Sequence, residues 1–241
     1  MTTLVLLPGL ASDAQMWRAQ LEALASYAPV VTDAHMRHDT IEAMAAALLA
    51  DHPGDLVLCG ASMGGMLAME VARQAPPQRM RGLALLGTSA APESTYMRAE
   101  RERAIVLFAQ GKVREVIEPN VRFAFHKAQA QDQALVRSYV DFVLRAGADA
   151  LIRQNRAVIA RPDARAHLPK LRCPVLVLCG DADQIAPPAC SREIASLIPQ
   201  AELGVVPQCG HMLTMEKPEL VNAALLAWLE KIWPEHARSG G

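Results

Sequence analysis

Short runs of apolar residues alternate along the chain with longer stretches that have helical periodicity. Such runs are typical of buried strands, and periodic apolar positions are typical of helices. The strand-like runs cover residues 3–7, 30–32, 56–59, 82–86, 174–179 and 202–206. Helices are predicted between them, at residues 17–25, 41–50, 63–74, 189–198 and 218–232. Asp39 is predicted as the N-cap of the second helix, with Glu42 as its capping-box partner. The alternation predicts an α/β protein with a mostly parallel sheet of about six strands, flanked by helices.

Residues 89–169 break this alternation, because they contain no convincing strand. Helices are predicted within them at residues 93–110, 113–120, 132–145 and 148–160. A helical insertion between two strands of such a sheet is expected to cover the strand ends. We therefore predict an α/β core from residues 1–88 and 170–235, a helical cap from residues 89–169, and a disordered tail at residues 236–241.

Composition and charge narrow the class of protein. A chain of 241 residues, 51% of them hydrophobic, can build one large α/β core. The 24 basic and 25 acidic residues leave a formal net charge of −1, which gives no electrostatic attraction to nucleic acid or to an anionic membrane. The amino-terminal apolar run is short for a signal peptide or a membrane span, and the five cysteines include no CxxC pair. A cytoplasmic protein without nucleic-acid or membrane partners is expected, and its oligomeric state stays open.

The segment Gly60-Ala61-Ser62-Met63-Gly64 lies between a predicted strand and a predicted helix. The pattern G-x-S-x-G in this context is typical of a nucleophile elbow, although a purely structural glycine-rich turn could share the spacing. A sharp turn makes the serine hydroxyl project from the sheet, and small neighbours let the strand and the helix approach closely. The backbone N–H that follows the serine can stabilise an oxyanion. Ser62 is therefore the predicted nucleophile.

Two further candidates follow the last two predicted strands. Asp183 lies in a loop that begins at Gly180, and His211 lies in a loop directly after Gly210. The order serine, acid, histidine is the one that hydrolases with this elbow use. Each residue lies beyond the carboxyl end of a strand, where open α/β sheets place their sites. We predict His211 as the general base and Asp183 as the acid that orients it.

These motifs resemble the α/β-hydrolase superfamily, especially small bacterial carboxylesterases and related acyl hydrolases. The matching segments are residues 7–10, 60–65, 180–187 and 210–211, and the resemblance spans nearly the whole chain, weakest in the predicted cap. It implies that the backbone N–H groups of Leu10 and Met63 form an oxyanion hole and that a substrate pocket lies between cap and sheet. Phe123, Phe125 and Tyr96 are the candidates for lining this pocket, although packing is the simpler role for aromatic residues there.

The resemblance also bears on the loop after the first predicted strand and on the loop that begins at Gly180. Many relatives carry His-Gly where this chain has Pro8-Gly9, so the hydrogen bonding of this loop is expected to differ. The resemblance also favours Asp183 over Asp181 as the acid. Asp181 is interpreted as a turn former, because Asp side chains accept hydrogen bonds from nearby backbone N–H groups.

The resemblance implies hydrolysis of a carboxylic ester of a small or medium organic substrate through an acyl-enzyme, with no cofactor and no metal. The same three residues would serve a thioesterase, a lactonase, an amide hydrolase or a cofactor-free perhydrolase. Serine at the elbow disfavours dehalogenases and epoxide hydrolases, which carry a carboxylate there. A non-catalytic hydrolase-like binding protein is a further alternative. Carbon–carbon bond hydrolysis or lyase chemistry would need additional polar groups from the cap.

Overall fold

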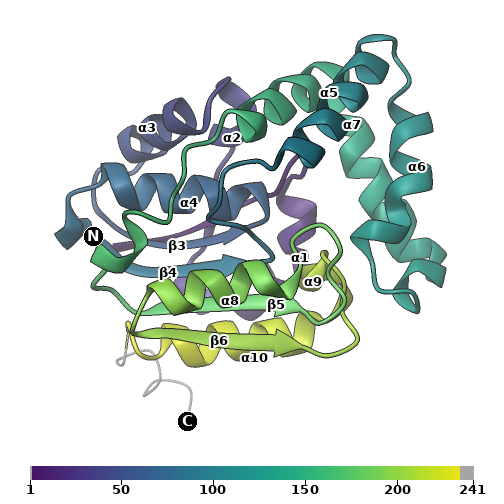
Figure 1. Ribbon diagram of the computed structural model, residues 1–241. Coiled ribbons are helices and arrows are strands. Elements are labelled where there is room, and N and C mark those ends of the chain that lie inside the picture. Colours follow the sequence, from purple (N-terminus) through teal and green to yellow (C-terminus); the bar gives the residue numbers. More distant parts are fainter. Residues whose placement is uncertain (1, 234–241) are drawn as a thin grey trace.

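The six predicted strands are all present and form one parallel sheet in the computed structural model, which describes residues 2–233. Their order in the sheet is β2-β1-β3-β4-β5-β6. The bounds are Thr2–Leu7 (β1), Val30–Val31 (β2), Asp55–Ala61 (β3), Met80–Leu86 (β4), Val175–Gly180 (β5) and Ala201–Val206 (β6). The predicted fold class, a parallel sheet of six strands flanked by helices, is confirmed (Figure 1).

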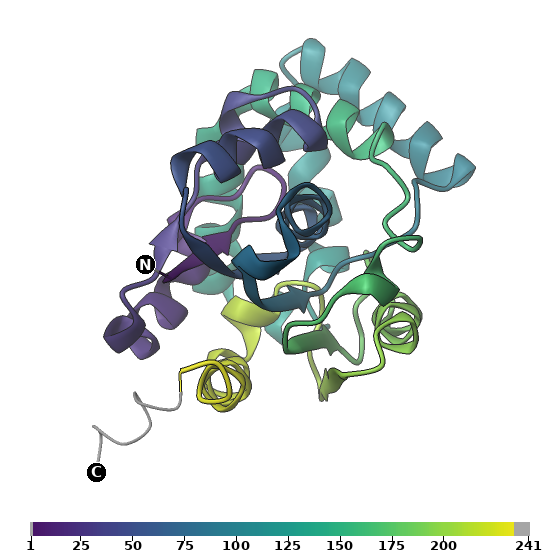
Figure 2. The ribbon, with the colours of Figure 1, turned by 90° about the vertical axis from the view of Figure 1, so that its left-hand side faces the viewer.

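Helices cover both faces of this sheet (Figure 2). Outside the insertion they are Arg18–Ala23 (α1), Ala34–Arg37 (α2), Ile41–Asp51 (α3), Met63–Gln74 (α4), Pro188–Leu197 (α8), Leu213–Glu216 (α9) and Pro218–Leu229 (α10). Alternate side chains of a strand point to opposite faces, so each strand contributes to two apolar cores. Leu58 packs on the face covered by α3, α4 and α8, and its neighbour Val57 packs on the face covered by α10. Burial on both faces explains why the strands are continuous apolar runs in the sequence.

The start of α3 differs from the prediction. Its N-cap is Thr40 and not Asp39, because the Thr40 hydroxyl accepts a hydrogen bond from the N–H of Ala43 at 3.1 Å. Asp39 lies one position too early for this bond, and its carboxylate is 3.5 Å from the guanidinium of Arg153 instead.

The segment between β4 and β5 forms three longer helices, Thr95–Ala109 (α5), Val113–Ala124 (α6) and Gln133–Ile159 (α7). They lie beyond the end of the sheet toward which the strand arrows point (Figure 1). The two helices predicted at residues 132–145 and 148–160 together form α7. Its helical conformation is interrupted at Gly147, which has φ 80° and ψ 170°. A positive φ carries no steric penalty for glycine, which explains why the two helical patterns in the sequence are separated at this residue.

Two further sequence predictions concern membrane-spanning segments and the C-terminal tail. None of the helices within residues 2–233 is both long and apolar enough to cross a membrane. The predicted tail at residues 236–241 lies outside the described residues.

Candidate active site

The strand order brings two loops together at one point of the sheet. From β1 the chain moves outward to β2, and it then returns to the other side of β1 with β3. In open parallel sheets, a crevice forms where the direction of strand addition reverses in this way. Leu7 at the end of β1 is paired with Gly60 near the end of β3. The loop that contains Leu10 and the turn that contains Ser62 therefore emerge side by side.

Ser62 forms the turn between β3 and α4 with a strained backbone. Its φ is 54° and its ψ is −118°, a combination that non-glycine residues rarely adopt. Two hydrogen bonds hold this conformation. The N–H of Ser62 donates to the carbonyl of Leu86 at 2.8 Å, and the hydroxyl of Thr88 donates to the carbonyl of Ser62 at 2.7 Å. Leu86 is the last residue of β4 and Thr88 lies just beyond it, so the neighbouring strand and the loop after it stabilise the strained turn.

The two glycines of the G-x-S-x-G pattern are required by close backbone contacts. A Cβ atom on Gly60 would overlap the carbonyl of Gly64, and a Cβ atom on Gly64 would overlap the carbonyl of Leu7. The first contact brings β3 against the start of α4. The second brings α4 against the end of β1. The spacing seen in the sequence therefore reflects the packing of three elements around Ser62.

The side chains of Ser62, His211 and Asp183 form a continuous chain of hydrogen bonds. The Nε2 atom of His211 is 2.9 Å from the Oγ atom of Ser62, and its Nδ1 atom is 2.8 Å from the Oδ2 atom of Asp183. The carboxylate can only accept, so Nδ1 carries the proton and Nε2 is free to accept the proton of Ser62. The other carboxylate oxygen, Oδ1, accepts the N–H groups of Ile185 and Ala186 at 2.9 and 2.8 Å. His211 and Asp183 are 8% and 3% exposed, so this chain is shielded from water.

Two N–H groups near Ser62 are not used by the fold. Within residues 2–233, the backbone N–H groups of Leu10 and Met63 have no hydrogen-bond acceptor. Met63 is the first residue of the 12-residue helix α4, where N–H groups are free and the helix dipole favours negative charge. These two groups are available for an oxyanion.

The comparisons with known proteins identify the family of this chain. Residues 4–224 match the alpha/beta hydrolase family. The chain belongs to the alpha/beta hydrolase family. A pimeloyl-(acyl-carrier protein) methyl ester esterase from Aromatoleum aromaticum is 30% identical over 239 residues, which cover 90% of this chain and 93% of that protein. A thermophilic esterase from Thermogutta terrifontis, solved with malate bound, has a TM-score of 0.85 and 29% identity, over 96% of this chain and 90% of that chain.

A third relative is named as an acetyltransferase component and not as an esterase. The dihydrolipoyllysine-residue acetyltransferase component of an acetoin cleaving system from Pseudomonas putida is 30% identical over an aligned length of 249 positions. This alignment covers 95% of this chain. The alpha/beta hydrolase described here spans 64% of the length of that relative. The family and the esterase-named relatives support a hydrolase.

In this alpha/beta hydrolase, the loop with Pro8-Gly9 is held by a residue of the insertion. The N–H of Gly9 is 3.2 Å from the sulfur of Met16, and the N–H of Ala11 donates to the side-chain oxygen of Gln154 at 2.6 Å. Gln154 belongs to α7 and is completely buried. Gln154 is not among the predicted site residues, because no local pattern connects it with a loop 143 positions earlier.

The loop that carries His211 is held from three sides. The carbonyl of Ala124, at the end of α6, accepts the N–H groups of His211 and Met212, both at 3.0 Å. A Cβ atom on Gly180, at the end of β5, would overlap the carbonyl of Gly210. Gly87, with φ 52°, leaves space on another side, since a Cβ there would lie 3.3 Å from Oδ2 of Asp183. Neither the positive φ at Gly87 nor the close contact at Gly180 is marked by a local sequence pattern.

Asp181 binds the loop that carries His211. Its Oδ1 atom accepts the N–H of Cys209 at 3.1 Å. This hydrogen bond, followed by one from Gln208, lowers the pKa of the Asp181 carboxyl. Asp183, in contrast, faces His211. The two acids of one loop thus have different partners, and the hydrogen bond that Asp181 accepts from Cys209 comes from the histidine loop.

The three aromatic residues expected to line a pocket lie in different surroundings. Tyr96 is 71% exposed at the start of α5. Phe123 lies at the surface, and the Cζ atom of the Arg122 guanidinium is 4.8 Å from the centre of the Phe123 ring. Phe125 is only 1% exposed, and its ring packs edge-on against Tyr139 at 5.4 Å. The expectation that the three form one pocket is therefore corrected, because amphipathic helices turn some of their aromatic residues to the core and others to solvent.

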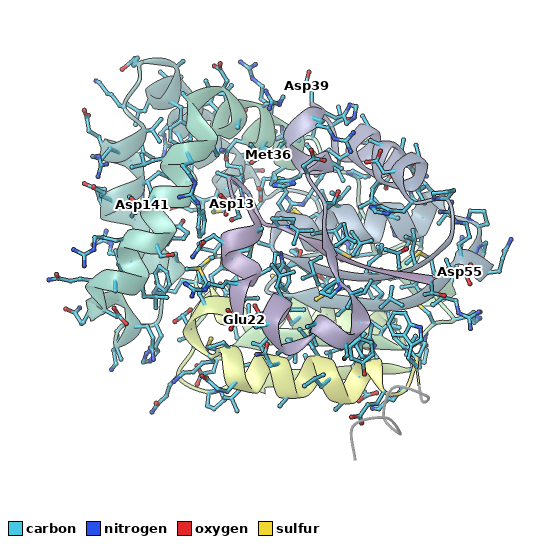
Figure 3. All side chains as sticks on the ribbon, turned by 180° about the vertical axis from the view of Figure 1, so that it is seen from behind. Asp13, Glu22, Met36, Asp39, Asp55 and Asp141 are labelled. Atoms are coloured by element: carbon cyan, nitrogen blue, oxygen red, sulfur yellow. The ribbon has the colours of Figure 1, made fainter. Side chains whose placement is uncertain are left out.

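A cavity of about 310 Å³ lies next to the Leu10 loop. Asp13 and Met36, labelled in Figure 3, line it beside α7. The side of the cavity that α7 contributes contains Phe142, Arg145 and Ala146. Arg145 and Asp13 form an ion pair across it at 2.7 Å. The lining is mostly apolar, and its volume is near the lower limit of small-molecule pockets.

Proposed function

We propose that this protein is a serine hydrolase that cleaves a carboxylic ester through an acyl-enzyme, with Ser62 as the nucleophile. The observation that carries the proposal is the hydrogen-bonded chain Ser62–His211–Asp183, with distances of 2.9 and 2.8 Å. It contains a nucleophile, a base within reach of its proton, and a buried carboxylate that orients the base. These are the parts that nucleophilic acyl transfer requires.

Acylation begins with proton transfer from the Ser62 hydroxyl to Nε2 of His211. The serine oxygen forms a bond to the ester carbonyl carbon, and the carbonyl electrons move to its oxygen. The N–H groups of Leu10 and Met63 stabilise this oxyanion. The tetrahedral intermediate then collapses, and the imidazolium gives its proton to the departing alcohol. Asp183 stabilises the imidazolium through Nδ1–H without taking up a proton itself.

Deacylation repeats the sequence with water. His211 accepts a proton from a water molecule, whose oxygen attacks the acyl carbon. Collapse of the second intermediate returns the proton to Ser62 and releases the carboxylic acid. The residues described here carry out every proton transfer, so the proposed mechanism uses no cofactor. Thioesters and lactones react by the same steps, and assays with each of these substrate classes distinguish an esterase from a thioesterase or a lactonase.

Burst kinetics test the proposal. With p-nitrophenyl acetate, we expect a rapid release of one nitrophenol per active site, followed by slower turnover, because an acyl-enzyme accumulates. A fluorophosphonate should label Ser62 and abolish both phases, which mass spectrometry of the labelled peptide can check. Parallel assays with thioesters and lactones rank the ester against the alternative acyl substrates. An active enzyme labelled at another serine would refute the assignment of the nucleophile, and a protein that binds esters but releases no nitrophenol, in a burst or in steady turnover, would be a non-catalytic binding protein.

We also infer that the helical insertion, residues 89–169, acts as a cap and that the cavity beside Leu10 accepts one arm of the ester. The cavity supports this inference because Ala11 and Ser12, which line it, directly follow Leu10. A methyl group built on Gly9 would lie 3.4 Å from Cβ of Ser62 and 3.6 Å from Oγ of Ser12. The wall near Ser12 is therefore close to the proposed nucleophile, and a short, uncharged arm fits the mostly apolar lining.

Filling this cavity should change the preference for substrate length. Ala146→Phe is expected to lower kcat/KM for p-nitrophenyl hexanoate by roughly tenfold or more relative to the acetate, the scale set by a few displaced methylene groups. Ala134→Phe is the matched control, because Ala134 is exposed on the same helix and does not line the cavity. Nitrophenyl esters vary the acyl arm, and a second series of acetate esters varies the alcohol arm. Unchanged length preference in both series would rule out the cavity as a subsite.

A further inference from the structure

Glu216, at the end of α9, is a buried carboxylate that the proposed mechanism does not use. It is 8% exposed and forms no salt bridge within residues 2–233. Burial raises the pKa of its carboxyl, and hydrogen bonds from the N–H groups of His126 and Gly210 oppose this rise. A buried carboxylate without a cationic partner costs stability. The burial of Glu216 is therefore compensated by hydrogen bonds from backbone N–H groups.

The partners of Glu216 are backbone N–H groups on two different segments. Gly210 donates to both carboxylate oxygens, at 3.0 Å to Oε1 and 3.1 Å to Oε2. The N–H of His126 donates to Oε2 at 2.8 Å. Gly210 directly precedes His211, and His126 follows α6 of the insertion. One carboxylate thus joins the loop that carries His211 to the insertion above it.

The same stretch of the insertion also contacts His211 directly. The carbonyl of Ala124 accepts the N–H groups of His211 and Met212. There is little free space at this junction, because a Cβ atom on Gly210 would lie only 2.5 Å from the backbone nitrogen of His126. The backbone on both sides of the Gly210–His211 bond is therefore fixed by hydrogen bonds, with Glu216 on one side and Ala124 on the other.

We propose that Glu216 is a positioning residue, which holds the histidine loop against the insertion so that His211 stays within hydrogen-bond distance of both Ser62 and Asp183. This inference rests on the proposed function of these three residues. The imidazole must satisfy two distances at once, 2.9 Å to Ser62 and 2.8 Å to Asp183, so a small shift of the loop lengthens at least one of them. A misplacement of about 1 Å can cost about a hundredfold in rate.

The chemistry of the side chain explains why a carboxylate is needed. Both oxygens of Glu216 accept hydrogen bonds, and the N–H of Gly210 lies between them. Glutamine would keep one accepting oxygen and direct an NH₂ group at a backbone N–H, which is also a donor. Glutamine should therefore retain part of the positioning, and alanine should retain none.

The experiment compares Glu216→Gln, Glu216→Ala and the control Glu93→Gln. Glu93 carries a carboxylate at the start of the insertion, and its side chain is 7% exposed, but it pairs with Arg101 and Arg161. We expect kcat for p-nitrophenyl acetate to fall about tenfold in Glu216→Gln and about a hundredfold in Glu216→Ala, with KM nearly unchanged. Glu93→Gln should lower the Tm and leave kcat close to that of the wild type. Fluorophosphonate labelling taken to completion counts the active sites of each variant, so unfolded protein does not affect the comparison.

Proton NMR provides a readout that does not depend on turnover. The proton between Nδ1 of His211 and Asp183 should give a far-downfield signal in the wild type and in Glu93→Gln, and the signal should be weakened or shifted in both Glu216 variants. Wild-type kcat together with an unchanged proton signal in both Glu216 variants would overturn the proposal. So would a fall in kcat of the same size in Glu93→Gln, since this would indicate general loosening. A wild-type protein that releases no nitrophenol from any of the esters would instead refute the proposed function, and the NMR comparison would still test the role of Glu216 in holding His211.

Discussion

Replacing Ser62 with alanine is expected to lower kcat for ester hydrolysis by between about 10⁴-fold and 10⁶-fold while the protein stays folded. Only the Oγ atom is lost, and the strained turn keeps its hydrogen bonds to Leu86 and Thr88. The residual rate should come from the oxyanion donors and substrate binding, which remain in place. Steady-state kinetics with p-nitrophenyl acetate and a thermal melt measure the two effects separately.

Ser89→Ala is the matched control for this variant. Ser89 follows β4 at the same edge of the sheet, and its hydroxyl accepts the N–H of Ala91 at 3.3 Å and contacts the thiol of Cys190. We expect its kcat and its fluorophosphonate labelling to equal those of the wild type. A Ser62→Ala protein that still shows a nitrophenol burst would contradict the assignment of Ser62.

Asp183→Asn should lower kcat by about 10⁴-fold, because His211 would be held in the wrong tautomer. The N–H groups of Ile185 and Ala186 donate to Oδ1, so the amide oxygen of the asparagine would occupy that position. The amide NH₂ would then face Nδ1 of His211 and remove the proton from that nitrogen. Nε2 would carry the proton instead and could not accept one from Ser62. The pH dependence of kcat and the loss of the downfield Nδ1 proton signal both report this change.

Asp181→Asn tests the choice between the two acids. Asp181 is exposed, and an asparagine oxygen can still accept the N–H of Cys209. We expect a cost in the free energy of unfolding below about 1 kcal/mol, on the scale of one hydrogen bond, and little change in kcat. If Asp181→Asn abolished activity and Asp183→Asn were active, the assignment of the acid would be wrong.

The sheet could be predicted closely from the sequence because its strands are buried on both faces. Such strands are uninterrupted apolar runs, so each predicted strand lies within one or two residues of the observed one. Helix α4 begins and ends at the predicted residues, since the elbow precedes it and Pro76-Pro77 follow it. The N-cap of α3 was misplaced by one residue because Asp39 and Thr40 are both good caps, and only the backbone geometry selects Thr40.

The sequence by itself determined the fold class, the elbow around Ser62, and the order in which the candidate acid and histidine follow it. These are local features, because a strand, a sharp turn and a helix are specified by residues that are neighbours in the chain. Tertiary structure alone decided which groups surround the site. The contacts from Gln154 to Ala11 and from Glu216 to His126 join residues 143 and 90 positions apart. The burial of Phe125 and the exposure of Tyr96 were decided in the same way. A single sequence does not specify such contacts, because they depend on how helices of the insertion pack over the sheet, and many packings satisfy the same periodic pattern.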